Sequence, residues 1–226
     1  MPRATPGSEA GLFEHLLGQI ETGGVASRTR VFSRGEVVFH EGDSGNTIHL
    51  VREGMFAVRA ATTAGRNLII NVLAAGDIFG EFAGFLPDER RTGSVTSLAG
   101  GTTTEIERAG IREALHAEPT LIEELMTAVV MKAESTRSRL VELLSVSADL
   151  RVLRALLMVH RLDPDGGPVP LTQQDLASLA ATTRPTANRI LREEVDRGTV
   201  LLTRGAISVL DPDRLARRAG VVQTLR

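Results

Sequence analysis

The sequence has 226 residues, enough for two domains with real cores, and its 26 basic and 28 acidic residues give a formal net charge of −2. It contains no cysteine, which excludes disulfides, zinc–thiolate sites and cysteine-ligated iron–sulfur clusters. No apolar run approaches the ~18 residues of a membrane span, and the first residues lead into no signal-peptide core, so we expect a cytoplasmic protein with no membrane partner.

Charge is distributed unevenly along the chain. Residues 1–150 hold 14 basic and 20 acidic residues, a net charge of −6, whereas residues 151–226 hold 12 arginines and 8 acidic residues, a net charge of +4. This asymmetry indicates a polyanionic partner for the C-terminal segment alone. All seven phenylalanines lie at or before Phe85, and there is no tryptophan or tyrosine. Without aromatic platforms for single-stranded bases, a nucleic-acid duplex is the expected target.

The N-terminal half predicts a short helix followed by a small β domain. Residues 1–23 comprise a polar tail and a helix, because Leu12, Phe13 and Leu16 follow helical spacing. Within residues 24–118, short runs with an apolar period of two alternate with glycine-containing turns, one of them at Glu53-Gly54. This pattern predicts an antiparallel barrel or jelly roll, with a short helix at residues 108–117.

The segment Phe79–Val95, FGEFAGFLPDERRTGSV, concentrates polar groups that suit a sugar phosphate. Arginine can make bidentate contact with phosphate oxygens, and glycine-rich backbone offers N–H groups to an anion. Glu81 can accept a hydrogen bond from a ribose hydroxyl. The simpler alternative is a solvated turn that carries a surface Glu–Arg pair.

Residues 119–147 predict a long helix that ends in a hinge at 145–148. The part from Thr120 to Leu144 contains neither proline nor glycine and would span ~37 Å. Its ends are apolar and its middle is polar, which favours pairing with a second copy over packing on the β domain alone. The expected heptad seam comprises Ile122, Leu125, Val129, Lys132, Thr136, Arg139 and Leu143.

Residues 148–226 predict a winged helix-turn-helix. A helix at Asp149–Arg161 is followed by a second that Thr172 caps, a tight turn, a third helix from Arg184, and a hairpin. Outward residues near the start of the third helix are of types that contact duplex DNA: arginine for guanine, asparagine for adenine and hydroxyls for phosphate. The predicted DNA-binding residues are Thr172, Arg184, Thr186, Asn188 and Arg189.

Gly80-Glu81, followed after nine residues by Arg91-Thr92-Gly93, resembles the phosphate-binding cassette of cyclic-nucleotide-binding domains. From about Arg30 to Ala219 the chain resembles bacterial transcription regulators of the Crp/Fnr (catabolite activator) family. The resemblance implies that Glu81 holds the ribose 2′-hydroxyl of a cyclic nucleotide. It also implies that Arg91 and Thr92 hold the cyclic phosphate, with the Gly80 backbone nearby.

In that family the long helix forms the dimer seam, and its middle meets the nucleotide base. Thr136 matches the residue that contacts the base, and Lys132 lies one turn earlier at a position that is often basic. The chain departs from the family at Arg137, which replaces a serine that reaches the base from the other subunit. This arginine could favour a guanine edge or form an internal ion pair. The chain also departs from the family at Pro185, which replaces an acidic residue that in many relatives accepts a hydrogen bond from cytosine.

The sequence therefore predicts an α+β protein with an N-terminal jelly-roll sensor, a long dimerisation helix and a C-terminal winged helix-turn-helix. We expect a homodimeric transcription regulator that binds a palindromic duplex operator, contacts RNA polymerase and responds to cyclic AMP as its effector. One alternative is the same regulator with another ligand, such as cyclic GMP or haem, or with none. The other is a cyclic-nucleotide sensor that controls a partner protein. The five histidines fall in no ligand or triad spacing, so we expect no catalytic residue and no metal.

Overall fold

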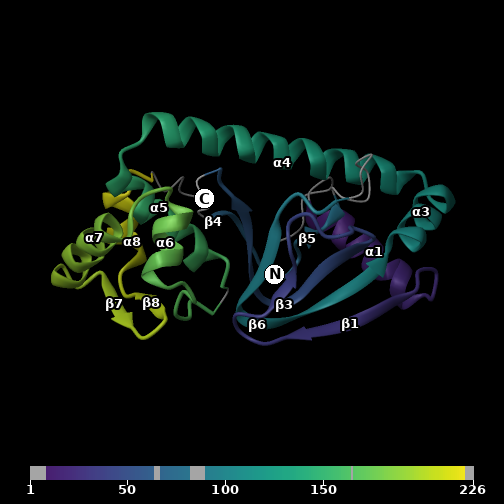
Figure 1. Cartoon of the computed structure of the whole chain (residues 1–226), viewed down its shortest axis with the longest axis horizontal. Coiled ribbons are helices and arrows are strands. Elements are labelled where there is room, and N and C mark those ends of the chain that lie inside the picture. The colour runs from purple at the N-terminus through teal and green to yellow at the C-terminus, as the bar shows by residue number, and fades with distance from the viewer. Residues whose placement is uncertain (1–8, 64–66, 82–89, 164, 222–226) are drawn as a thin grey trace. The chain divides into compact units, whose positions relative to one another are not determined.

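The computed structural model describes residues 9–63, 67–81, 90–163 and 165–221. The chain divides into two compact units: Met1–Ala60 with Leu73–Ser138 form the first, and Ala61–Val72 with Arg139–Arg226 form the second. The first is built mainly on antiparallel strands and the second mainly on helices (Figure 1), which confirms the predicted α+β class.

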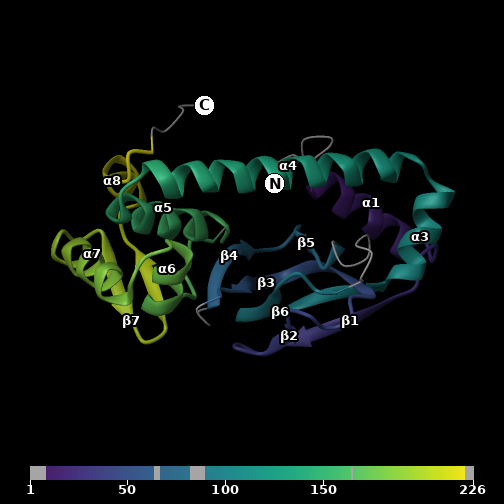
Figure 2. The ribbon, with the colours of Figure 1, turned by 45° about the horizontal axis from the view of Figure 1, so that its top comes forward.

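The sheet contains six strands, four of them in the order β1-β6-β3-β4, while β2 pairs with β6 and β5 pairs with β3 (Figure 2). The pairs β1–β6, β2–β6, β3–β5 and β3–β6 are antiparallel, as the sequence predicts. The strands are β1 (Ser27–Phe32), β2 (Val37–Phe39), β3 (Thr47–Ala61), β4 (Asn67–Leu73), β5 (Ile78–Phe79) and β6 (Ser94–Glu107).

The turn predicted at Glu53-Gly54 is wrong, because β3 continues through this dipeptide. The pairing of β3 with β6 shifts register on both sides of it, as at a β-bulge. Gly54 has a φ of 87°, and a Cβ atom there would overlap the backbone of Gly100 and Gly101 in β6. Glycine therefore lets two bent strands approach closely here, which a pattern of apolar letters does not distinguish from a turn.

Helix α1 (Glu9–Glu21) confirms the predicted N-terminal helix. Its Leu12, Phe13 and Leu16 side chains are buried in one cluster with Ile48 and Ile106 of the sheet. Burying each such side chain stabilises the unit by roughly 1.5–3 kcal/mol. Helices α3 (Arg108–Ala117) and α4 (Thr120–Ser145) also form where the sequence predicts them.

The second unit contains the predicted helix-turn-helix and hairpin. Thr172 caps α6 with a full capping box: its hydroxyl accepts from the Asp175 N–H, and the Asp175 carboxylate accepts from the Thr172 N–H. The turn after α6 passes through Ala181, whose φ of 48° lies in the left-handed region. The elements are α5 (Ala148–Arg161), α6 (Gln173–Leu179), α7 (Arg184–Asp196), β7 (Val200–Thr203), β8 (Ala206–Val209) and α8 (Pro212–Arg218).

Candidate ligand-binding and DNA-binding sites

Arg91 is the best-anchored cation of the predicted phosphate site. Its side chain is buried, and Nη1 donates to the carbonyl oxygens of Thr47 and Gly80 at 2.8 and 3.0 Å. Nη2 donates to the Thr47 hydroxyl at 2.7 Å. The guanidinium also lies over the Phe39 ring, with Cζ 4.0 Å from the ring centroid. These contacts fix the plane of the guanidinium before any ligand arrives.

One donor of Arg91 is left over. Its Nε–H is buried and has no acceptor within the described part of the chain. Three of the five guanidinium N–H groups are given to protein oxygens, which leaves one N–H on Nη2 besides the Nε–H. Burial lowers the pKa of Arg91, yet the group stays charged because its unperturbed value is so high. A buried cation with such a donor to spare is suited to an anion.

Gly80 is required by this arrangement. Its φ is 86°, and a Cβ atom would lie 2.5 Å from Nη1 of Arg91 and 3.0 Å from the Thr47 carbonyl oxygen. Any side chain would therefore displace the guanidinium or the strand beside it. Gly93 is similarly constrained, since a Cβ there would lie 2.8 Å from the Arg59 carbonyl oxygen.

Glu81 lies beside Arg91 and is occupied by a side chain from the long helix. Lys132 of α4 places its Nζ 2.5 Å from Oε1 of Glu81, which is only 7% exposed. The space lined by Glu81, Lys132, Leu125 and Ile78 measures about 10 Å³. Arg91 is not among the residues that line this space, so its volume describes the contact of α4 with Glu81 and not the predicted phosphate site.

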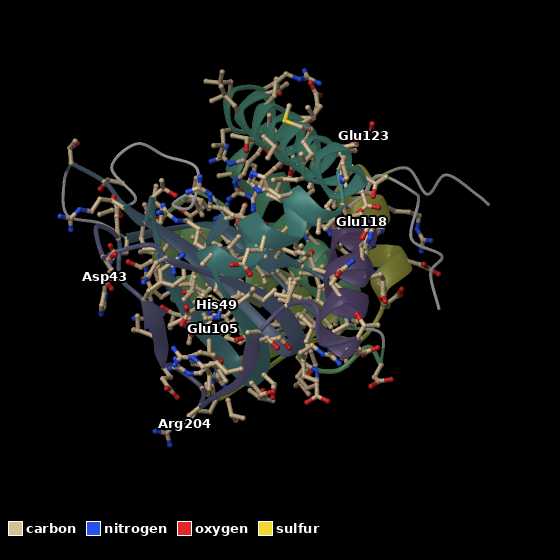
Figure 3. The ribbon with its side chains drawn as sticks, turned by 90° about the vertical axis from the view of Figure 1, so that its right-hand side faces the viewer. Asp43, His49, Glu105, Glu118, Glu123 and Arg204 are labelled. Carbon is tan, nitrogen blue, oxygen red and sulfur yellow. The ribbon has the colours of Figure 1, made fainter. Side chains whose placement is uncertain are left out.

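A buried histidine lies behind Arg91. His49 of β3 stacks on Phe79, with ring centroids 4.8 Å apart and planes 3° from parallel. Its Nδ1 is 3.1 Å from the Thr103 hydroxyl, and its Nε2 is 3.5 Å from the Thr47 hydroxyl that accepts from Arg91. Glu105 of the neighbouring strand β6 lies on the same side (Figure 3), 3.7 Å from Nε2.

His49 is neutral in the folded protein. Burial, followed by the positive charges of Arg91, Arg30 and Arg28, lowers its pKa to about 3. The Glu105 carboxylate does not offset this effect, because it already pairs with Arg28 and Arg30 of β1. Sequence analysis assigned His49 no role, since a single histidine in a strand gives no signal of its partners.

Acid should therefore destabilise the protein through His49. The unfolded chain takes up a proton near the ordinary pKa of 6.5, whereas the folded chain does so only near 3. Stability is then lost progressively as pH falls between these values, by about 2 kcal/mol at pH 5. Urea unfolding at about pH 7 and pH 5 should show a smaller acid loss in His49→Gln than in the parent. His116→Gln, at an exposed position, is the matched control; equal acid losses in all three proteins would contradict the assignment.

Three other predicted ligand-binding residues, Thr92, Thr136 and Arg137, make no side-chain hydrogen bond or ion pair with Arg91 or Glu81 within the described residues. Thr92 is exposed beside Arg91. On α4, the Thr136 hydroxyl donates to the Lys132 carbonyl oxygen of its own helix, and Arg137 pairs with Glu134. The latter is the internal ion pair that the sequence left open. The tip of the cassette, residues 82–89, lies outside the described residues.

The predicted heptad seam of α4 is only partly exposed: Ile122, Val129 and Thr136 are exposed, whereas other members face the protein. Lys132 turns toward Glu81, and Arg139 turns inward to donate to the Leu179 carbonyl oxygen. A different series is exposed, at alternating spacings of four and three residues: Met126, Val130, Ala133, Arg137, Leu140 and Leu144. This series is apolar except at Arg137, and its spacing is that of a coiled-coil seam.

In the second unit, the predicted DNA-binding residues lie on the outer side of the helix-turn-helix. Thr183 caps α7 by accepting from the Thr186 N–H, and Pro185 occupies the first turn, where its missing N–H has no cost. Arg184 is exposed, whereas Asn188 is half-buried with an Oδ1 atom that has no donor within the described residues. Arg189 is paired with Asp149 and Glu193.

Two surface depressions adjoin these residues and include side chains that the sequence analysis missed. One, of about 620 Å³, follows α7 and is lined by Arg192 as well as by Arg184 and Asn188. Helical periodicity could have identified Arg192, which lies one turn beyond Asn188. The other, of about 440 Å³, lies between the start of α6 and the hairpin, and its lining includes Gln173, Gln174 and Arg204.

Within the described ranges, no three His, Cys, Asp or Glu side chains are grouped as a metal site would require. None of the helices there is long and apolar enough to cross a membrane.

Two family models match the chain. The model of the cyclic nucleotide-binding domain matches residues 29–118, and that of the Crp-like helix-turn-helix domain matches residues 150–218. A Mycobacterium tuberculosis protein named CRP-like cAMP-activated global transcriptional regulator is 27% identical over 223 residues, which cover 94% of this chain and 97% of the relative.

Solved structures show the same fold. FixK2 from Bradyrhizobium japonicum is similar with a TM-score of 0.73 at 17% identity, covering 85% of this chain and 97% of that chain. The regulator CLP from Xanthomonas campestris, described as c-di-GMP responsive, is similar with a TM-score of 0.70 at 20% identity and covers 85% and 98%. The predicted fold class is therefore confirmed, and the family that the sequence resembles is found by independent comparison.

Proposed function

Because the chain belongs to the Crp/Fnr family of transcription regulators, we propose that it is a homodimeric, sequence-specific DNA-binding regulator controlled by a cyclic nucleotide, with cyclic AMP as the first candidate. The observation that carries this proposal is the Nε–H of Arg91, which is buried near the Glu81 carboxylate and has no acceptor within the described residues. The helix-turn-helix argues against the alternative of a sensor that acts only on a partner protein.

In the proposed complex, the cyclic phosphate accepts from Nε–H and Nη2–H of Arg91, with the Thr92 hydroxyl nearby. The ribose 2′-hydroxyl donates to Glu81 and so competes with Lys132 for that carboxylate. The base reaches α4 at Thr136, whose hydroxyl must rotate away from the Lys132 carbonyl oxygen to contact it. The contacts with Glu81 and Thr136 each replace an interaction within the protein by one with the ligand.

Cyclic AMP is proposed first because the Mycobacterium tuberculosis relative is named as cAMP-activated. The fold alone does not select the nucleotide, since CLP has the same fold and is described as c-di-GMP responsive. Arg137 is held by Glu134 in this structure, which favours an internal role over contact with a guanine edge. Calorimetric titration with cyclic AMP and cyclic GMP distinguishes the two effectors.

The ion pair between Lys132 and Glu81 gives the proposed ligand a means of acting on α4. A ligand shifts an equilibrium only by its differential affinity for the two states. Here Glu81 is paired to Lys132, so a ribose hydroxyl that donates to Glu81 competes with Lys132, and binding favours the state in which α4 has released this carboxylate. The seam of α4 is thereby coupled to occupancy of the site.

Dimerisation through the exposed series on α4 should be lost in Val130→Glu. Val130 is 57% exposed in the single chain, so the substitution costs little in the monomer but would place two like charges face to face at the dimer seam. Sedimentation equilibrium should show a dimer for the parent and a monomer for the variant. Glu134→Gln, on the same helix, is the control that should remain dimeric. A parent protein that sediments as a monomer would refute the proposed dimer.

Selection from a random-sequence duplex library in the presence of cyclic AMP tests the DNA-binding function. We expect a palindromic sequence whose half-sites lie about one helical turn apart, because two copies of α7 related by a two-fold axis face successive major grooves. Enrichment of an unsymmetrical sequence would contradict dimeric binding, and no enrichment would contradict specific DNA binding.

A further inference from the structure

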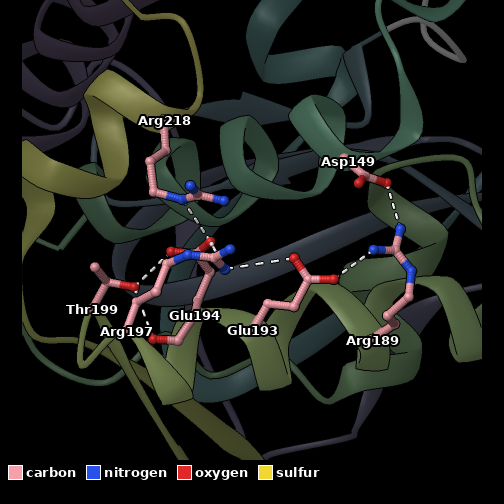
Figure 4. A network of polar contacts seen from close by, with 7 residues as sticks. All are labelled: Asp149, Arg189, Glu193, Glu194, Arg197, Thr199 and Arg218. Carbon is pink, nitrogen blue, oxygen red and sulfur yellow. Dashed lines mark hydrogen bonds and ion pairs between the residues drawn. The ribbon is translucent and has the colours of Figure 1, made fainter.

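Arg189, a predicted DNA-binding residue of α7, is held by two carboxylates. Its Nη2 donates to Oδ1 of Asp149 at 2.7 Å, and its Nη1 donates to Oε1 of Glu193 at 2.6 Å (Figure 4). Asp149 comes from the first turn of a different helix, α5. Both terminal nitrogens of the guanidinium are thus engaged, although about half of the side chain is exposed.

The two carboxylates are anchored differently. Glu193 lies one turn further along α7 and also pairs with Arg197 (Figure 4). Arg197 in turn pairs with the buried Glu194, which also pairs with Arg218. Glu193 therefore retains a cationic partner when Arg189 moves. Asp149 loses its arginine when Arg189 turns toward a ligand. The hydrogen bonds that Arg189 donates to Asp149 and then to Glu193 raise its pKa, in line with a guanidinium that is already well paired.

DNA requires the same donors. Bidentate contact with guanine O6 and N7, or with two phosphate oxygens, uses two N–H groups on one edge of the guanidinium. In the arrangement shown in Figure 4, these groups point to carboxylates. The two hydrogen bonds engage one N–H on each terminal nitrogen and fix the orientation of the group. A bidentate contact that turns Arg189 toward DNA is therefore made at the expense of the contact with Asp149, and the Asp149 carboxylate would remain beside the polyanion.

We propose that Asp149 competes with DNA for Arg189 within the chain and so limits the affinity of α7 for duplex DNA. This inference rests on the DNA-binding function proposed above and adds a residue of α5 that restrains the recognition helix. It differs from an aiming role, in which Asp149 would orient Arg189 for DNA and its removal would weaken binding. The two roles therefore predict opposite signs.

The size of the effect is bounded by the strength of the pair. Exposed arginine–carboxylate pairs are weak, so releasing one arginine changes affinity by at most about 5-fold, and a dimer with two such arginines gains at most about 25-fold. Removing the Asp149 carboxylate strengthens a DNA complex less if Arg189 stays with Asp149 in that complex than if Arg189 is released. Asp149→Asn should therefore strengthen binding to the selected operator at least as much as binding to a shuffled duplex.

The experiment measures fluorescence anisotropy of the selected duplex at constant salt and saturating cyclic AMP. The parent, Asp149→Asn, Arg189→Ala and the double variant form a cycle that isolates the coupling between the two residues. Asp196→Asn is the matched control, because Asp196 lies on the same face of α7 and its replacement removes an equal charge. Circular dichroism melting checks that each variant folds.

We expect tighter binding by Asp149→Asn, a much smaller change by Asp196→Asn, and no gain from Asp149→Asn when Arg189 is already alanine. Weaker binding by Asp149→Asn would overturn the proposal in favour of aiming. An equal gain with and without Arg189 would overturn it in favour of general charge repulsion. If the parent binds no duplex, the DNA-binding function itself fails; if it binds but the cycle shows no coupling, only the competition is refuted.

Discussion

Arg91→Leu is expected to weaken cyclic AMP binding at least about 100-fold, because it removes two charge-assisted hydrogen bonds to the phosphate, each worth about 1.5–3 kcal/mol. The buried Nε–H, which has no acceptor within the described residues, supports this size of effect, since a bound phosphate would supply one. Isothermal titration of the parent and the variant with cyclic AMP and cyclic GMP measures the loss directly.

Arg91 also has structural contacts, so the variant needs controls. Leucine removes the hydrogen bonds to Thr47 and Gly80, and the melting temperature must show that the first unit still folds. Arg91→Lys retains the charge but not the two-pronged edge, and it should keep part of the affinity. Arg90→Leu, at the exposed neighbouring residue, should bind normally. Undiminished binding by a folded Arg91→Leu protein would refute the site.

Arg184→Ala should cause the largest loss of operator affinity among single substitutions in α7. Arg184 is exposed at the first turn of the helix and borders both surface depressions. A bidentate contact between arginine and guanine contributes about 1–3 kcal/mol, and a symmetric dimer loses two of them, so affinity should fall about 30-fold or more. Anisotropy titration of the selected duplex measures the change.

The same titration on duplexes substituted at each operator position separates base contact from phosphate contact. If Arg184 contacts guanine, the variant loses discrimination at one position of each half-site; if it contacts phosphate, binding weakens uniformly and the salt dependence becomes less steep. Arg217→Ala, which removes an equal charge from the exposed side of α8, should change affinity little. An equal loss in both variants would contradict direct contact by Arg184.

Local signals made parts of the fold predictable. The Thr172 capping box and the Pro185 helix start are each determined by residues close together in the chain, and each is found where the sequence indicates. Glu81 and Arg91 could be selected because residue types and spacing together suit a sugar phosphate. Whether they bind one is a prediction for titration.

Contacts between distant residues could not be predicted. Lys132 meets Glu81 across 51 positions, and Asp149 meets Arg189 across 40, with no pattern in the letters to pair them. The seam of α4 stays a prediction for a related reason: a heptad pattern does not distinguish side chains that face the helix's own chain from those that face a partner. Gly54 shows a third limit of sequence-based prediction, because glycine is preferred both in β-bulges and in turns and so does not distinguish them.

The most direct test of the account is the affinity of the selected operator for the parent protein with and without saturating cyclic AMP. Anisotropy should show tighter binding with the nucleotide by about 5- to 150-fold, the usual range of allosteric coupling, and no such change in Arg91→Leu. Equal operator affinity with and without cyclic AMP and cyclic GMP, in a parent protein that binds the operator specifically, would contradict control by a cyclic nucleotide at Arg91.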